Sequence, residues 1–188
     1  DVGDEGAGAL LEQLGRDVLR APAAAGGAVE LARLFPGHGQ QLGQALQEHL
    51  PGPVIGCTTA GQLSETGFQR GGISGASLAS DELSVVPYLI RPLSAQAEQV
   101  GKIAEDIQER LSCSNVPAFG FLLVDGLSMQ EEHLISALYM ALGNVPIVGG
   151  SAGDSLKFKQ TCVYYNGEVL HDAAAFTLFL TTLPFHVF

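Results

Sequence analysis

The chain has 188 residues, of which 46% are hydrophobic and only 15% are charged, so it can bury a core and is not a disordered chain. Its net charge is −11 with no basic patch, which argues against nucleic acid and anionic membranes as partners. No apolar run approaches the roughly 18 residues that cross a bilayer, so no membrane-spanning segment is expected.

The first half of the chain predicts two helices and four strands. Leucines and valines recur at helical spacing in two segments, while alternating or short continuous apolar runs indicate the strands. In chain order we expect a helix over 6–20, a strand over 29–35, a helix over 40–50, a strand over 54–57, a polar loop over 58–67, and strands over 72–78 and 83–90.

The second half predicts the same order of elements. Ser128 and Glu131 have the spacing of a capping box, S-x-x-E, which predicts a helix start. Asn166-Gly167 is a strong signal for a two-residue hairpin turn. We expect a helix over 94–113, a strand over 118–124, a helix over 129–142, a short strand over 145–148, and strands over 158–165 and 169–183.

The repeated order suggests an internal duplication. Phe35 matches Val124 at an offset of 89 residues, and Ile55-Gly56 matches Val148-Gly149 at an offset of 93. We therefore predict one domain over 1–188 containing a repeat over 6–92 and 94–184. The predicted fold class is α/β, with two α-β-α-β-β-β units forming mixed sheets flanked by helices; a four-layer αββα sandwich and a single continuous sheet are both open.

Two equivalent loops are the predicted ligand site. Each follows a short apolar strand and is rich in small and hydroxyl residues, at 56–61 and at 149–154. Backbone N–H groups and hydroxyls in such loops can hold a carboxylate or a phosphate. The alternative is that the small residues only allow the two loops to pack closely against each other. The predicted ligand-binding residues are Gly56, Cys57, Thr58, Thr59, Gly61, Asp125, Gly149, Gly150, Ser151 and Asp154.

The loops also carry a resemblance to a known family. Residues Val54–Gly61 (VIGCTTAG), Leu123–Ser128 (LVDGLS) and Pro146–Asp154 (PIVGGSAGD) resemble signature segments of the FIST domain family, named for F-box and intracellular signal transduction. The resemblance runs from about residue 6 to Phe188 and corresponds to the N-terminal FIST region. It implies a bacterial sensory domain that binds small ligands such as amino acids. The implied partners are a histidine kinase, a diguanylate cyclase or a chemotaxis component.

One branch of that family consists of nitric-oxide-sensing haem proteins, so the resemblance also raises haem b as a cofactor. His38, between two glycines at the end of a predicted strand, is the best-placed candidate for a haem ligand. A surface histidine in a loop is the alternative. Covalent haem attachment is excluded because the chain has no CxxCH motif.

Enzymatic activity is the less favoured hypothesis. Cys57 or Thr58 could act as a nucleophile with His38 as the base, and Asp125 with Asp154 could act as paired carboxylates. The chain nevertheless has no G-x-S-x-G, H-E-x-x-H or metal-spaced histidine motif. Its three widely spaced cysteines predict a reduced, cytoplasmic protein. We therefore predict a non-enzymatic module that binds a small ligand, with a homodimer allowed.

Overall fold

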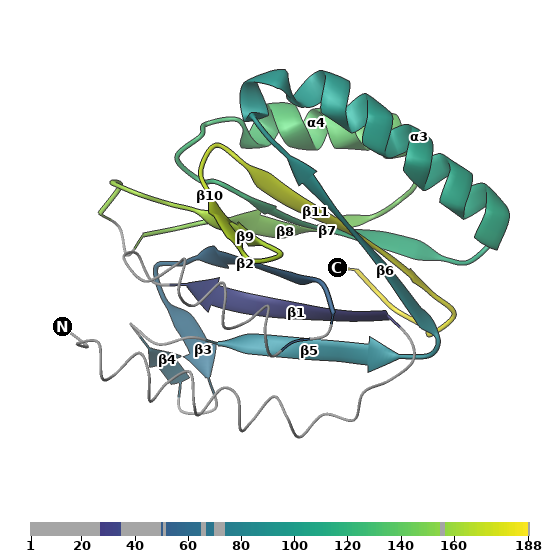
Figure 1. The fold of residues 1–188 in the computed structure, drawn as a ribbon, viewed down its shortest axis with the longest axis horizontal. Coiled ribbons are helices and arrows are strands. Elements are labelled where there is room, and N and C mark those ends of the chain that lie inside the picture. Colours follow the sequence, from purple (N-terminus) through teal and green to yellow (C-terminus); the bar gives the residue numbers. More distant parts are fainter. Residues whose placement is uncertain are drawn as a thin grey trace.

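Two larger β-sheets, a short β-hairpin and two α-helices form the described part of the chain, which in the computed structural model comprises residues 27–34, 50, 52–64, 67–69, 74–154 and 157–187 (Figure 1). The elements are β1 (Gly27–Leu34), β2 (Val54–Thr58), β3 (Gln62–Ser64), β4 (Gly67–Gln69), β5 (Gly75–Ser80), β6 (Leu83–Ile90), the 3-10 turn η1 (Leu93–Ala95), α3 (Gln96–Ser114), β7 (Ala118–Val124), α4 (Glu131–Leu142), β8 (Ile147–Ser151), β9 (Val163–Tyr165), β10 (Glu168–Leu170) and β11 (Ala174–Thr181).

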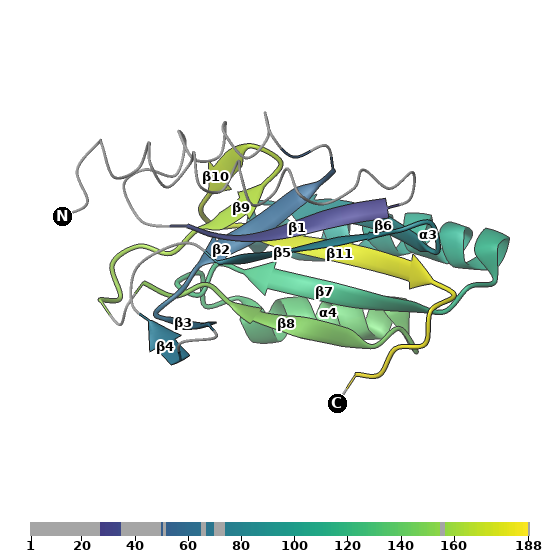
Figure 2. The ribbon, with the colours of Figure 1, turned by 90° about the horizontal axis from the view of Figure 1, so that it is seen from below.

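The strands form a five-stranded sheet in the order β10-β9-β2-β1-β5, a four-stranded sheet in the order β6-β11-β7-β8, and a β3–β4 hairpin. Both larger sheets are mixed, because β1–β2 and β7–β8 are parallel pairs and the other pairs are antiparallel. Helices α3 and α4 cover one face of the four-stranded sheet (Figures 1 and 2). The predicted α/β class with mixed sheets and flanking helices is confirmed, and the alternative of one continuous sheet is wrong.

The predicted helix over 6–20 lies outside the described residues, as does nearly all of the one over 40–50. The fourth layer of an αββα sandwich therefore stays a prediction. The same pairing pattern recurs in both sheets: β1 is parallel to β2 and antiparallel to β5, and β7 is parallel to β8 and antiparallel to β11. The single domain and the internal repeat themselves also stay predictions.

Strand β11 is the centre of the hydrophobic core, and all eight of its residues are buried. Because side chains alternate along a strand, Phe176 and Leu178 face α3 and α4, where they join Ile107 and Leu138. Phe179 faces the other sheet, in a second cluster with partners that include Ile55, Leu123 and Val163. The mostly apolar sequence of β11 is thus explained by a strand that is buried on both faces.

The segment 169–183 was expected to be one strand and is two. Strand β10 pairs with β9 in the five-stranded sheet, whereas β11 pairs with β6 and β7 in the other sheet. The chain changes sheets at Asp172, which has a left-handed backbone with φ of 49°. Its N–H donates to Asp125 Oδ2 at 2.7 Å. A tertiary hydrogen bond, which local sequence does not encode, supports this bend.

Other element boundaries also differ from the predictions. The polar loop over 58–67 contains β3 and the start of β4, the strand over 72–78 is β5 at Gly75–Ser80, and only Val163–Tyr165 of 158–165 is a strand. Strand β8 continues through the glycine run to Ser151, because Gly149 and Gly150 still pair with β7. The predicted strands over 83–90 and 118–124 are confirmed as β6 and β7.

The predicted capping box is wrong. Gln130 is the N-cap of α4, and its side chain makes no capping hydrogen bond. The Ser128 hydroxyl instead donates to the Asp125 carbonyl oxygen at 2.6 Å and accepts from the Gln130 N–H at 3.3 Å. The Glu131 carboxylate accepts from the Ser151 hydroxyl at 3.3 Å. Ser128 therefore closes the turn that follows β7, and Glu131 connects α4 to β8.

Candidate functional site

The predicted site segments meet at one end of the two sheets, where β2, β7 and β8 finish. The Gly153 N–H donates to the Thr58 carbonyl oxygen at 2.9 Å, and the Ala152 N–H donates to the Val124 carbonyl oxygen at 2.7 Å. Ligands of α/β proteins bind preferentially at the carboxyl ends of parallel strands. The structure thus brings the loops after β2, β7 and β8 together at a position suited to binding.

Glycines let these loops approach each other closely. A Cβ placed on Gly126 would lie 2.2 Å from the Ala152 carbonyl oxygen, and one on Gly153 would lie 3.2 Å from the Ala60 nitrogen. A Cβ on Gly61 would lie 2.1 Å from the ring of Phe68 in β4. The packing alternative considered for these loops therefore accounts for Gly126, where a Cβ would meet backbone, and in part for Gly153, whereas the exposed ring of Phe68 can move away from a side chain at Gly61.

Asp125 lies at the centre of this arrangement, with a buried carboxylate that accepts three hydrogen bonds. Its Oδ1 accepts from the Leu127 N–H at 3.2 Å and from the Thr161 hydroxyl, and its Oδ2 accepts from the Asp172 N–H. These donors come from the loop after β7, the segment before β9 and the β10–β11 connection. Asp125 is therefore an anchor for three segments.

Asp154 has the same kind of role for one loop. Its Oδ1 accepts from the Phe158 N–H at 2.8 Å, and its Oδ2 accepts from the N–H groups of Lys159 at 2.5 Å and Gln160 at 3.0 Å. These bonds, led by the one from Lys159, hold the pKa of Asp154 below its ordinary value because they favour the charged carboxylate. The loop that leaves β8 is wrapped around this side chain.

Thr58 and Cys162 join β2 to the segment before β9. The Thr58 N–H donates to the Cys162 carbonyl oxygen at 3.0 Å, and the Cys162 N–H donates to the Thr58 hydroxyl oxygen at 3.1 Å. Burial raises the pKa of the Cys162 thiol above its ordinary value, and the charge of Asp125 raises it further, against the effect of the Thr58 hydroxyl. Cys162 is therefore a poor nucleophile.

Gly56 and Cys57 lie within β2 rather than in a loop, and the half-buried Cys57 packs against the cluster between the sheets. The Thr59 hydroxyl donates to the Gly61 carbonyl oxygen at 2.7 Å. Gly149, Gly150 and Ser151 are exposed residues of β8. The loops that contain the ten predicted residues thus meet in the fold, but the side-chain oxygens of Thr58, Asp125 and Asp154 are already hydrogen-bonded within the protein.

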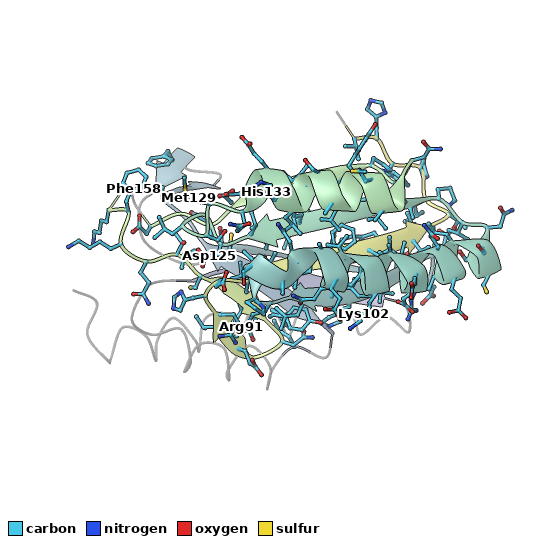
Figure 3. The ribbon with its side chains drawn as sticks, turned by 90° about the horizontal axis from the view of Figure 1, so that it is seen from above. Arg91, Lys102, Asp125, Met129, His133 and Phe158 are labelled. Atoms are coloured by element: carbon cyan, nitrogen blue, oxygen red, sulfur yellow. The ribbon has the colours of Figure 1, made fainter. Side chains whose placement is uncertain are left out.

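Sequence reasoning missed two apolar residues beside these loops. Met129 is 81% exposed and Phe158 is 74% exposed. Both have a left-handed backbone, with φ of 56° and 52°, which is unusual and strained for large side chains. Figure 3 shows them at the same end of the molecule as Asp125. No sequence pattern signals such a conformation, since it arises from the turns that the buried aspartates stabilise.

The described residues contain no group of three or more His, Cys, Asp or Glu side chains that could hold a metal ion. His38, the predicted haem ligand, lies outside the described residues. Haem binding stays a prediction. In the described part of the chain, no helix combines the length and the apolar character needed to cross a membrane.

The architecture defines an α/β domain of two mixed sheets, with a loop cluster at the ends of its parallel strands. The FIST N domain family matches residues 31–188, and the chain belongs to this family of sensory domains of signal transduction. The chain is also 27% identical over 146 residues to the uncharacterized protein MJ1623 of Methanocaldococcus jannaschii. That match covers 73% of this chain but only 28% of the archaeal protein.

Proposed function

We propose that this chain is a non-enzymatic input module that binds a free amino acid at the loop cluster. The observation that carries the proposal is the pair of exposed, strained side chains, Met129 and Phe158, beside the loops after β7 and β8. Backbone strain of this kind is found preferentially at functional sites. The two side chains offer an apolar surface for the side chain of the ligand.

The charged groups of an amino acid have matching groups nearby. Asp125 and Asp154 each accept three hydrogen bonds already, so Glu131 is the carboxylate we assign to the ligand's amino group. Glu131 is the first residue of α4 and contacts Ser151 of β8. The N–H groups at the start of α4 are suitable donors for the ligand's carboxylate.

Signal output belongs to the same proposal. A module of this kind passes ligand occupancy by contact to a cytoplasmic histidine kinase, diguanylate cyclase or chemotaxis component. The match covers only 28% of the archaeal relative. The activity of a whole protein that contains this module is therefore also a proposal. A hydrolase that uses Cys57 or Thr58 is less favoured, since Thr58 is buried and bonded to Cys162.

The test is a thermal-shift screen of free amino acids, followed by calorimetric titration of each hit. A ligand at about 100 times its Kd stabilises the folded state by roughly 2.7 kcal/mol, which is readily detected. Glu131→Gln should weaken binding by about 10- to 100-fold, because a hydrogen bond to a charged group contributes about 1.5–3 kcal/mol. Glu98→Gln, on the exposed surface of α3, is the matched control and should bind normally.

The variants Met129→Gly and Phe158→Gly distinguish an effect on ligand affinity from an effect on the stability of the fold. Glycine removes the left-handed strain, which costs about 1–2 kcal/mol for other residues, so both variants should be at least as stable as the wild type. We nevertheless expect both to bind the amino acid more weakly, since they lose the apolar surface. A flat thermal-shift response across all amino acids, or unchanged affinity in Glu131→Gln, would contradict the proposal.

A further inference from the structure

Strand β8 is an open edge of the four-stranded sheet. Within the described part of the chain it pairs only with β7, and its last three residues, Gly149, Gly150 and Ser151, are exposed. Natural edge strands usually carry charged residues, prolines or covering segments that prevent pairing with another chain. The opposite edge, β6, has Pro87, whose carbonyl oxygen accepts from the Tyr165 hydroxyl at 3.1 Å. The residues of β8 itself include no such protection.

The backbone of β8 has hydrogen-bonding groups on that open side. The Pro146 carbonyl oxygen accepts from the Gly120 N–H, and the Ala152 N–H donates to the Val124 carbonyl oxygen, so even-numbered residues face β7. Because backbone groups alternate along a strand, the N–H and C=O groups of Ile147, Gly149 and Ser151 face away from β7. A further strand can therefore pair with this edge.

Helix α4 adds exposed apolar side chains next to the same edge. Leu134, Leu138 and Leu142 are its buried stripe, and Ala141 accepts a hydrogen bond from Gln108 of α3. At about 100° per residue, Ile135 and Tyr139 lie on the flank that faces away from α3. They are 50% and 71% exposed. Figure 2 shows α4 behind β7 and β8, which places this flank on the side of the open edge.

The charge pattern indicates what can approach this surface. The chain carries a net charge of −11, yet no Asp, Glu, Lys or Arg occurs between Glu132 and Asp154. This stretch includes most of α4, the connection after it and all of β8. A second copy, with the same −11 charge, meets the least repulsion where both surfaces are uncharged.

We propose that a second copy of this chain docks on the β8 edge, so that two β8 strands pair antiparallel about a two-fold axis at Gly149. Gly149 then pairs with its counterpart, and Ile147 pairs with Ser151 of the other copy. The outward N–H and C=O groups of all three residues are satisfied together. The two four-stranded sheets become one continuous sheet, and Ile135 and Tyr139 of each α4 face the other copy.

Sedimentation velocity at low and high protein concentration tests this interface. We expect a species of twice the 19.6 kDa chain mass at high concentration, and more of it as salt screens the repulsion between the copies. Tyr139→Glu should shift the protein to monomer by placing a charge in each half of the interface. Ala97→Glu adds the same charge on the exposed start of α3 and should remain dimeric. Ile135→Glu is a second interface variant, and thermal unfolding confirms that each variant is folded.

Amide hydrogen exchange locates the interface directly. The N–H groups of Gly149 and Ser151 should be protected in the wild-type dimer and exchange freely in folded Tyr139→Glu. A monomer at every concentration would overturn the proposal and leave the edge to another partner. A dimer that survives both Tyr139→Glu and Ile135→Glu, or one in which these amides exchange freely, would overturn it as well. None of these measurements depends on the ligand of the loop cluster.

Discussion

Asp125 is the residue on which the loop cluster depends most. Its carboxylate accepts from Leu127, Thr161 and Asp172, and the side chain is buried. Asp125→Ala leaves the Thr161 hydroxyl and the Asp172 N–H without this acceptor, while the Leu127 N–H keeps the Thr161 hydroxyl oxygen. We expect the free energy of unfolding to fall by roughly 3 kcal/mol. Urea denaturation measures this loss. Asp125→Asn should cost less, because its amide oxygen still accepts on one side.

A double mutant distinguishes this role from a general effect of removing charge. Thr161→Val removes one of the donors, so its cost and that of Asp125→Ala should not add. If the double mutant loses the full sum of the two single losses, the hydrogen bond between these side chains does not contribute as described. This outcome would also weaken the assignment of Asp125 as an anchor rather than a ligand contact.

At the residue scale, the sequence located the important positions but not their contacts. Asp125, Asp154 and Thr58 stood out because each follows a short apolar strand. The hydrogen-bond partners of Asp125 are 2, 36 and 47 residues away, those of Asp154 are 4 to 6 away, and Cys162 is 104 away from Thr58. The long-range partners depend on which strands become neighbours. The exposed Met129 was not predicted, because a left-handed backbone at a large residue has no local sequence signal.

Two neighbouring glycines of strand β8 differ in how much space the structure leaves for a side chain. A Cβ on Gly149 would lie 1.8 Å from the Leu122 carbonyl oxygen, whereas one on Gly150 meets nothing within 4 Å. Gly149→Ala must displace β8 from β7, and we expect it to cost about 3 kcal/mol or more, in the range of severe core substitutions. Gly150→Ala should be tolerated to within about 0.5 kcal/mol. Thermal or urea unfolding of the two variants compares them directly.

Equal losses in the two alanine variants would contradict this view of β8. Gly101→Ala provides a reference in a helix, because a Cβ there also meets nothing within 4 Å. Alanine is favoured over glycine inside a helix by about 1 kcal/mol, so this variant should be more stable than the wild type. An increase in the free energy of unfolding of Gly101→Ala would show that the stabilisation from replacing a glycine can be measured in this protein.

Element prediction succeeded where one face or both faces of a strand are regularly buried. Strands β6 and β7 have the predicted bounds because apolar alternation or a continuous apolar run sets them. The division of 169–183 was not predictable, because the bend at Asp172 depends on the Asp125 carboxylate. The short β3 and β4 were also missed, since three-residue strands in a polar segment have no detectable period.

At the scale of the whole molecule, the loop after β8 connects the two sheets. It leaves the four-stranded sheet at Ser151 and enters the five-stranded sheet at Val163. Asp154 organises this connection through the N–H groups of Phe158, Lys159 and Gln160. Loss of these bonds therefore releases a link between the sheets and not only a surface loop.

This link predicts how stability responds to acid. The pKa of Asp154 in the folded protein lies below its ordinary value of 3.8, so unfolding in acid takes up a proton at this group. Its stabilising contribution is complete above the ordinary pKa and is lost as the pH falls through the lowered folded value. We expect the free energy of unfolding, measured by urea denaturation from neutral pH downward, to decline through this window.

Two variants identify the cause of that decline. Asp154→Asn should be less stable than the wild type at neutral pH and should lose less stability through the acid window, because it has no proton to take up. Lys159→Ala keeps the backbone N–H that binds Asp154 and removes only the side-chain charge, so it should retain the wild-type acid response. If Lys159→Ala instead abolishes the response, the lysine charge and not the backbone hydrogen bonds lowers the pKa of Asp154.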